Sequence, residues 1–98
     1  MDSEWFVYII EAENGRLYTG ITKDLTRRLA QHRKGTGAKF FRSSSPKSFR
    51  MKEGKFDRST ALRLEWRIKK LSRLQKLTLC KRGGFRKFYQ QFLNGNLT

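Results

Sequence analysis

The chain has 98 residues, 37% of them hydrophobic, which is enough to fill one modest core, so residues 1–98 are expected to form a single domain. Its 23 Lys and Arg residues outnumber 8 Asp and Glu residues and give a formal net charge of +15, so nucleic acid is the first expected partner. A membrane partner is not expected, because the basic residues lie along the whole chain and no apolar run approaches the roughly 18 residues that span a bilayer.

Two further features of the composition concern the cellular compartment. The first residues, MDSEW, are acidic where a signal peptide would be basic and then apolar, so a cytoplasmic location is expected. Cys80 is the only cysteine, which leaves neither an internal disulfide nor a cysteine-based zinc cluster possible. We expect Cys80 to be a reduced, partly buried thiol.

The first twenty residues are predicted to form a β-hairpin. Residues 5–10 are apolar at every position and rich in aromatic and β-branched side chains, which favours a central strand covered on both faces. A turn signal follows at residues 13–15, and residues 16–21 resume strand character.

The length of the hairpin loop decides where the two tyrosines of the hairpin lie. A two-residue turn at Asn14 and Gly15 would put Tyr8 and Tyr18 on opposite faces of the sheet. A three-residue loop at residues 13–15, with Gly15 in the left-handed conformation, sets Tyr8 opposite Gly20 and brings both hydroxyls to one face. We predict the three-residue loop.

A helix, a loop and a third strand are predicted next. Asp24 is a good N-cap for a helix that runs to about Lys34 and stops at Gly35. Residues 35–47 mix glycine, serine, proline and cations, which indicates a long exposed loop rather than a packed element. Residues 48–53 alternate in polarity and are predicted to form a third strand.

The last third of the chain is predicted to be helical. Asp57 or Ser59 can cap a helix that begins near Thr60, and a break near Ser72 would divide the pattern into two helices. Residues 84–93 form a last, basic and aromatic helix, whose stripe is Phe85, Phe88, Tyr89 and Phe92. Core packing explains this stripe more simply than a base-stacking platform does.

Glu65 stands where packing alone would not place a carboxylate. On a helical wheel it lies within about 40–60° of both Ala61 and Ile68, so it is set into the apolar face of its helix. Burying an unpaired carboxylate costs several kcal/mol, and a cation must therefore meet it. The wheel leaves two readings open, an ion pair with an arginine or a metal ion.

Arg28 and His32 form a second unusual pair. They lie one helical turn apart, on a face that adjoins Leu25 and Leu29. A lone histidine at a helix end is more often structural than catalytic, but its alignment with an arginine near the core edge favours a functional reading.

These residues together resemble the GIY-YIG nuclease superfamily, which includes homing endonucleases and an excision-repair incision subunit. Phe6-Val7-Tyr8 stands at the GIY motif and Tyr18-Thr19-Gly20 at the YIG motif, followed by Arg28, His32 and Glu65 in the order the family has. Each tripeptide alone would be weak evidence, whereas the ordered set is specific.

The resemblance covers about residues 4–75, and residues 35–39 are similar to a small stand-alone bacterial branch of the family. Phe6, Val7 and Thr19 replace the glycine and the two isoleucines of the motifs, and none of these changes removes a polar group. Substrate choice is the property left open, because no second domain is expected to supply specificity.

The resemblance implies an α+β fold, with a small three-stranded antiparallel sheet flanked by helices, and a metal-dependent endonuclease acting on DNA, in repair or recombination. Glu65 would hold Mg²⁺ or Mn²⁺, with waters and a phosphate oxygen in the other positions. Arg28 would neutralise charge on the phosphate, Tyr8 would activate or orient the water, Tyr18 would bind the phosphate or that water, and His32 would tune a phenol.

Substrate contacts are also expected outside these five residues. Gly20 would let the backbone approach the substrate closely, and Lys39, Arg42 and Lys47 in the long loop would contact phosphates without reading sequence. We expect the two phenols, Arg28 and Glu65 to converge on one concave, basic surface. The rival hypothesis is a DNA- or RNA-binding module without catalysis, although a pure binder has no use for a carboxylate facing a polyanion.

Overall fold

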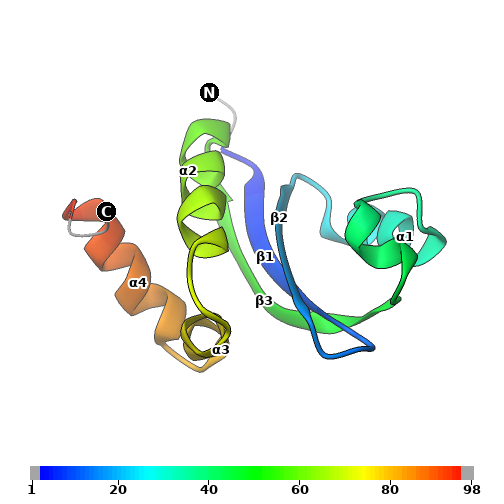
Figure 1. Ribbon diagram of the computed structural model, residues 1–98. Coiled ribbons are helices and arrows are strands. Elements are labelled where there is room, and N and C mark those ends of the chain that lie inside the picture. The colour runs from blue at the N-terminus through cyan, green and yellow to red at the C-terminus, as the bar shows by residue number, and fades with distance from the viewer. Residues whose placement is uncertain (1–2, 96–98) are drawn as a thin grey trace.

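The computed structural model describes residues 3–95, which form a three-stranded antiparallel sheet with helices on both faces (Figure 1). The strands, in the spatial order β2-β1-β3, are β1 (Trp5–Ala12), β2 (Leu17–Thr22) and β3 (Pro46–Phe56). The helices are α1 (Leu25–Lys34), α2 (Arg58–Lys69), α3 (Arg73–Cys80) and α4 (Gly84–Leu93), with a short 3-10 helix, η1 (Lys39–Arg42), before β3. This is the α+β fold that the resemblance implied.

β1 is the central strand, and both of its faces are covered. Val7 and Ile9 point into a core that α2, α3 and α4 close, together with Leu64, Ile68 and Phe88. Tyr8 and Ile10 point to the other face, where α1 and η1 cover them. All four of these β1 side chains have 0% exposure, which explains why the strand is apolar at every position.

Local capping signals set the helix ends as the sequence predicted. The Asp24 side chain accepts a hydrogen bond of 3.0 Å from the Arg27 amide, and Gly35 ends α1 with φ +75°. Asp57 caps α2 by accepting 2.8 Å from the Thr60 amide. Ser72 caps α3 and produces the expected break between α2 and α3.

Two sequence predictions about the middle of the chain need correction. The third strand is longer than residues 48–53, because it pairs with β1 from Pro46 to Phe56. Residues 35–47 are not one exposed loop, since η1 buries Phe41 to 4% exposure and β3 already begins at Pro46. Phe41 reaches the core across the turn of η1, a tertiary contact that the local glycine and serine content conceals.

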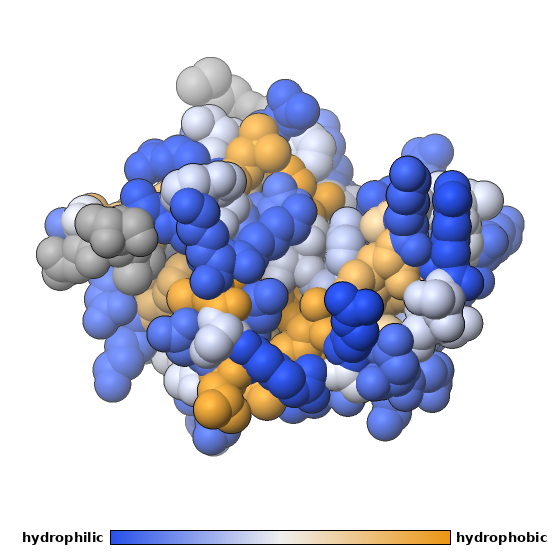
Figure 2. Space-filling view, in the orientation of Figure 1, coloured by the Kyte–Doolittle hydropathy of each residue, from blue (hydrophilic) through white to orange (hydrophobic). Residues whose placement is uncertain are grey.

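No helix within residues 3–95 is both long enough and apolar enough to cross a membrane. The longest helices, α1, α2 and α4, pack one face against the sheet or against a neighbouring helix, and most of their charged residues are exposed. Figure 2 shows hydrophilic residues over most of the visible surface.

Candidate active site

The hairpin adopts the register that brings the two tyrosines together. The Ala12 amide donates to the Arg16 carbonyl at 2.9 Å and Gly15 has φ +85°, so the loop is residues 13–15. Tyr8 then pairs with Gly20, and Tyr18 with Ile10. The two phenol rings lie on one face of the sheet with centroids 6.2 Å apart.

His32 completes a buried polar pair with Tyr8. α1 lies over the tyrosine face, and the His32 side chain on its inner side has 0% exposure. A hydrogen bond of 2.9 Å joins the Tyr8 hydroxyl to His32 Nε2. Burial, followed by the charge of Arg28, lowers the pKa of His32 to about 4, so the imidazole is neutral at physiological pH.

Burial also keeps the Tyr8 phenol neutral. It raises the pKa of Tyr8 to about 12, and the hydrogen bond with Arg28 opposes that rise only in part. The Tyr8 side chain has 0% exposure, whereas Tyr18 is half-buried. Tyr18 is therefore the phenol of the pair that solvent can reach.

Arg28 connects the two phenols to the surface. Its Nη1 donates to Gln31 Oε1 at 3.0 Å, and its guanidinium interacts with both the Tyr8 and the Tyr18 phenol. Burial acts to lower the pKa of Arg28, but the two phenols outweigh it and the net shift is upward. A permanently charged fork beside two hydroxyls is suited to hold an anion such as a phosphate.

The structure gives Gly20 a different role from the one that the sequence suggested. The space where its Cβ would lie is filled by the Tyr8 side chain, with the hydroxyl at 2.5 Å and Cζ at 2.7 Å from the ideal Cβ position. Gly20 is itself buried, so it makes room for Tyr8 rather than for a substrate. The tyrosine of the first motif and the glycine of the second are thus one packing unit.

Two residues of this site were missed by the sequence reasoning. Phe41 packs on His32 and on Tyr18, with ring centroids 4.5 Å and 5.1 Å away. A Cβ on Gly37 would meet His32 Nδ1 at 2.6 Å, so only glycine fits against the ring. The glycines at positions 35 and 37 were the only sign in the sequence of this packing. Both were interpreted as turn residues, and the packing of Gly37 on His32 was therefore not predicted.

Glu65 approaches this site from the other side of the sheet. It lies on α2, which packs on the β1 and β2 strands, and its negative charge contributes to the raised pKa of Tyr8. Its carboxylate is 19% exposed and pairs with Lys69 Nζ at 3.3 Å, so a lysine one turn away replaces the arginine considered in the ion-pair reading. Figure 2 shows the surface hollowed above β2, between the α2 side and the α1 side.

A divalent ion fits Glu65 only in a particular kind of site. No cluster of three potential His, Cys, Asp or Glu ligands exists within residues 3–95. Mg²⁺, however, is often held by one or two carboxylates, with waters and substrate phosphates as its other ligands. Glu65, half-buried and paired with Lys69, could belong only to that second arrangement, in which waters and the substrate phosphate supply most of the ligands.

The three cations proposed for substrate contact separate into two places. Lys39 and Arg42 are exposed on η1, next to the phenylalanines that pack on Tyr18. Lys47 lies in β3 instead of the loop, at the sheet edge opposite β2, and its charge acts on Glu11. Lys47 is thus separated from β2, the strand that carries Tyr18, by the central strand β1.

A groove of about 320 Å³ adjoins the site between the end of the hairpin and α1. Arg27, Arg28 and Gln31 line it from α1, and Trp5 and Ile21 line it from the strands. Arg27 was not among the residues singled out from the sequence, because an exposed arginine on a helix carries no local signal.

Comparison with known proteins identifies the family of this chain. The family model described as the GIY-YIG catalytic domain matches residues 4–78 of this chain. The chain therefore belongs to the GIY-YIG family of nucleases, and the tyrosine pair, Arg28, His32 and Glu65 all lie inside the matched segment.

The relatives are themselves small proteins. The chain is 51% identical over 77 residues to UPF0213 proteins of Yersinia pestis (strain Pestoides F) and Yersinia pseudotuberculosis (serotype I, strain IP32953), covering 76% of this chain and 79% of each relative. The solution structure of a UPF0213 protein from Bacillus halodurans is 36% identical, with a TM-score of 0.52, and the match covers 82% of this chain and 85% of that one.

Proposed function

We propose that this protein is a metal-dependent endonuclease that hydrolyses phosphodiester bonds in DNA at the Tyr8, Tyr18, Arg28, His32 and Glu65 site. The observation that supports it most is the position of Arg28, whose guanidinium interacts with both the Tyr8 and the Tyr18 phenol. A cation placed with two hydroxyls, together with a carboxylate whose charge acts on one of them, supplies parts that phosphoryl transfer uses.

Each side chain has a distinct part in this proposal. Arg28 binds a non-bridging phosphate oxygen and stabilises the charge that grows on it. Tyr18, the solvent-accessible phenol, orients the attacking water. This role passes to Tyr18 from Tyr8, to which the sequence analysis assigned it. Tyr8 and His32 hold the site in shape through their buried hydrogen bond of 2.9 Å.

The reaction breaks one phosphorus–oxygen bond. The water oxygen bonds to phosphorus as its proton passes to solvent, the bond to the leaving sugar oxygen breaks, and that oxygen takes up a proton from solvent, so that protons balance. Mg²⁺ or Mn²⁺, when bound at Glu65, supplies Lewis-acid stabilisation of the phosphate and the leaving oxygen. Because Glu65 already pairs with Lys69, the ion must displace Lys69 or share the carboxylate with it.

The alternative is a DNA- or RNA-binding module that retains the scaffold without cleavage. The Glu65–Lys69 ion pair at 3.3 Å favours the binding module, because it gives Glu65 a structural partner that needs no metal. The two hypotheses differ in what happens when the carboxylate is neutralised.

One experiment separates them. Purified protein is incubated with branched, single-stranded and duplex DNA and with RNA, in Mg²⁺, Mn²⁺ or EDTA. Under the endonuclease hypothesis Glu65→Gln abolishes cleavage and leaves binding equal or tighter, because a negative charge near phosphate is lost. Lys69→Gln is the matched control and retains cleavage, since it removes the partner of Glu65 but not the ligand.

Cleavage that survives EDTA or Glu65→Gln would overturn the metal assignment. Metal-dependent cleavage by Glu65→Gln protein, accompanied by lower stability, would mean that Glu65 serves only as half of an ion pair. Binding without cleavage of any of the four substrates would favour the binding module.

A further inference from the structure

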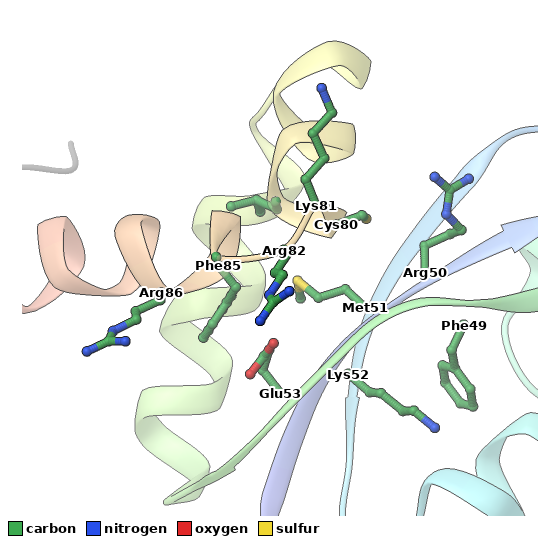
Figure 3. Close-up of a pocket in the computed structure, with 12 residues that line it drawn as sticks. Phe49, Arg50, Met51, Lys52, Glu53, Cys80, Lys81, Arg82, Phe85 and Arg86 are labelled. Carbon is green, nitrogen blue, oxygen red and sulfur yellow. The ribbon is translucent and has the colours of Figure 1, made fainter.

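A second groove lies along the edge strand β3, where α3 and α4 approach it. It has a volume of about 480 Å³ and is formed by β3 on one side and the junction between α3 and α4 on the other (Figure 3). Met51, Leu79 and Phe85 line it as buried apolar residues. Met51 pairs with Ile9, and both belong to the core that α2, α3 and α4 cover. Phe49 also lines the groove, and its ring packs on Tyr8 from the other face of β3, with centroids 5.7 Å apart.

The lining of this groove is strongly basic. It contains five Lys and Arg residues and one acidic residue, Glu53. Arg50 is paired with Glu11 at 2.7 Å, whereas Lys81, Arg82 and Arg86 have no ion-pair partner in the described part of the chain. Glu53 is the only opposing charge among the lining residues, and burial raises the pKa of its carboxyl group.

The cations on one wall come from outside the segment that matches the family. The match ends at residue 78, and Lys81, Arg82 and Arg86 follow it. Residues 66–98 contain nine Lys and Arg and no Asp or Glu. In Figure 3, Lys81, Arg82 and Arg86 come from the α3–α4 side and Arg50 comes from β3.

We propose that this groove is a second nucleic-acid contact, which binds a phosphodiester backbone separate from the strand at the tyrosine site. Arginine forks match phosphate oxygens in pairs, and an apolar floor can pack against sugars between the phosphates. An extended polyanion fits unpaired cations spread along a groove better than a single small anion does. The proposal rests on the protein binding nucleic acid and is independent of cleavage.

The test uses the full chain and two reporters on opposite faces. Short duplex DNA is titrated into ¹⁵N-labelled protein, and the amide signals of Gly83 and Gly84 report on the groove. The ring signals of His32 report on the tyrosine site, and they are unambiguous because His32 is the only histidine. The groove variant is Lys81→Gln/Arg82→Gln, and the control is Lys70→Gln/Lys87→Gln, which removes the same charge from residues that do not line the groove.

DNA is expected to shift both sets of signals in the wild-type and control proteins. In the groove variant the Gly83 and Gly84 shifts are lost, the His32 shifts remain, and the plot of log affinity against log salt becomes less steep by up to about 2. Persistence of the DNA-dependent His32 shifts shows that the tyrosine face of the variant is folded, and dispersed Gly83 and Gly84 signals in the absence of DNA show that the α3–α4 junction is folded as well.

Two outcomes would overturn the proposal. One is a groove variant that behaves like the control, and the other is glycine signals that respond to heparin or to phosphatidylglycerol vesicles but not to DNA. A wild-type protein that cleaves nothing, yet shows the DNA-dependent glycine shifts, would leave this proposal standing and remove only the endonuclease.

Discussion

The Tyr8 hydroxyl lies 2.9 Å from Nε2 of His32, and both side chains have 0% exposure. A strand near the N-terminus and the end of α1 are thereby joined by a polar contact inside the smaller of the two cores. Because the pair is buried, its protonation states are coupled to folding, and this makes the site measurable without a substrate.

The protonation of His32 predicts an acid-sensitive stability. The pKa of His32 is about 4 in the folded chain and about 6.5 when unfolded, so the unfolded state binds the extra proton between these values. The free energy of unfolding should be highest above pH 6.5 and fall by about 2–3 kcal/mol as the pH approaches 4. Urea unfolding at several pH values measures this, and NMR titration of the single histidine gives its pKa directly.

The control for this prediction is His32→Gln, which should unfold with a weaker dependence on pH between 4 and 6.5. A histidine pKa near 6.5 in the folded protein would show that the imidazole is open to water. That result would contradict the buried pair.

Removing the Tyr8 hydroxyl should mainly lower stability, whereas removing the Tyr18 hydroxyl should mainly lower the cleavage rate. Tyr8→Phe removes the buried partner of His32 and should lower the free energy of unfolding by about 1–3 kcal/mol. Tyr18→Phe leaves that bond intact, so its stability should change less, while cleavage falls by about 10²-fold or more. Urea unfolding and cleavage rates of both variants test the assignment, which fails if Tyr18→Phe cleaves normally.

Gly20→Ala should disturb the site through Tyr8. The new methyl group would lie 2.5 Å from the Tyr8 hydroxyl, and the ring cannot move away without breaking its bond to His32. We expect a loss of about 1–3 kcal/mol in the free energy of unfolding. In a Tyr8→Leu background the same substitution should cost less, and equal costs in the two backgrounds would exclude the contact.

Replacing Thr19, which stands where the second motif has isoleucine, by valine should stabilise the protein. Its side chain is 3% exposed, and its Oγ1 is buried without a hydrogen-bond partner in residues 3–95. Thr19→Val keeps the shape and removes the unpaired hydroxyl, so the free energy of unfolding should rise by about 1 kcal/mol. Thr22→Val is the opposite control, because Thr22 Oγ1 accepts from the Asp24 amide at 3.1 Å and its loss should destabilise the chain.

The basic residues of η1 should contribute to binding more than Lys47 does. Lys39→Gln/Arg42→Gln removes two exposed cations beside Tyr18, and the salt dependence of DNA affinity should become less steep by up to about 2. Lys47→Gln, on the far strand, should change binding at the tyrosine site less than Lys39→Gln does. Fluorescence anisotropy over a range of salt concentrations measures both, and equal effects would contradict the placement of Lys47.

Interactions between residues close in sequence determine where most of the helices begin and how the hairpin pairs. The caps at Asp24, Asp57 and Ser72 act within three residues along the chain, and the left-handed Gly15 fixed the hairpin loop. Because a strand alternates its faces every residue, that one loop length was enough to place Tyr8 and Tyr18 on the same face. These parts of the site followed from neighbours in sequence.

Other properties depended on contacts between distant residues, and these only the tertiary structure decided. The burial of Phe41 comes from packing on His32 and Tyr18, and the sequence around it resembled a solvent-exposed loop. Glycine is required at position 20 because the side chain of Tyr8, twelve positions earlier, fills the space beside it, and not because a substrate approaches there. The accessible phenol could be chosen only once the exposure of Tyr8 was known, because burial depends on what every other element covers, and a pattern along one strand does not contain that information.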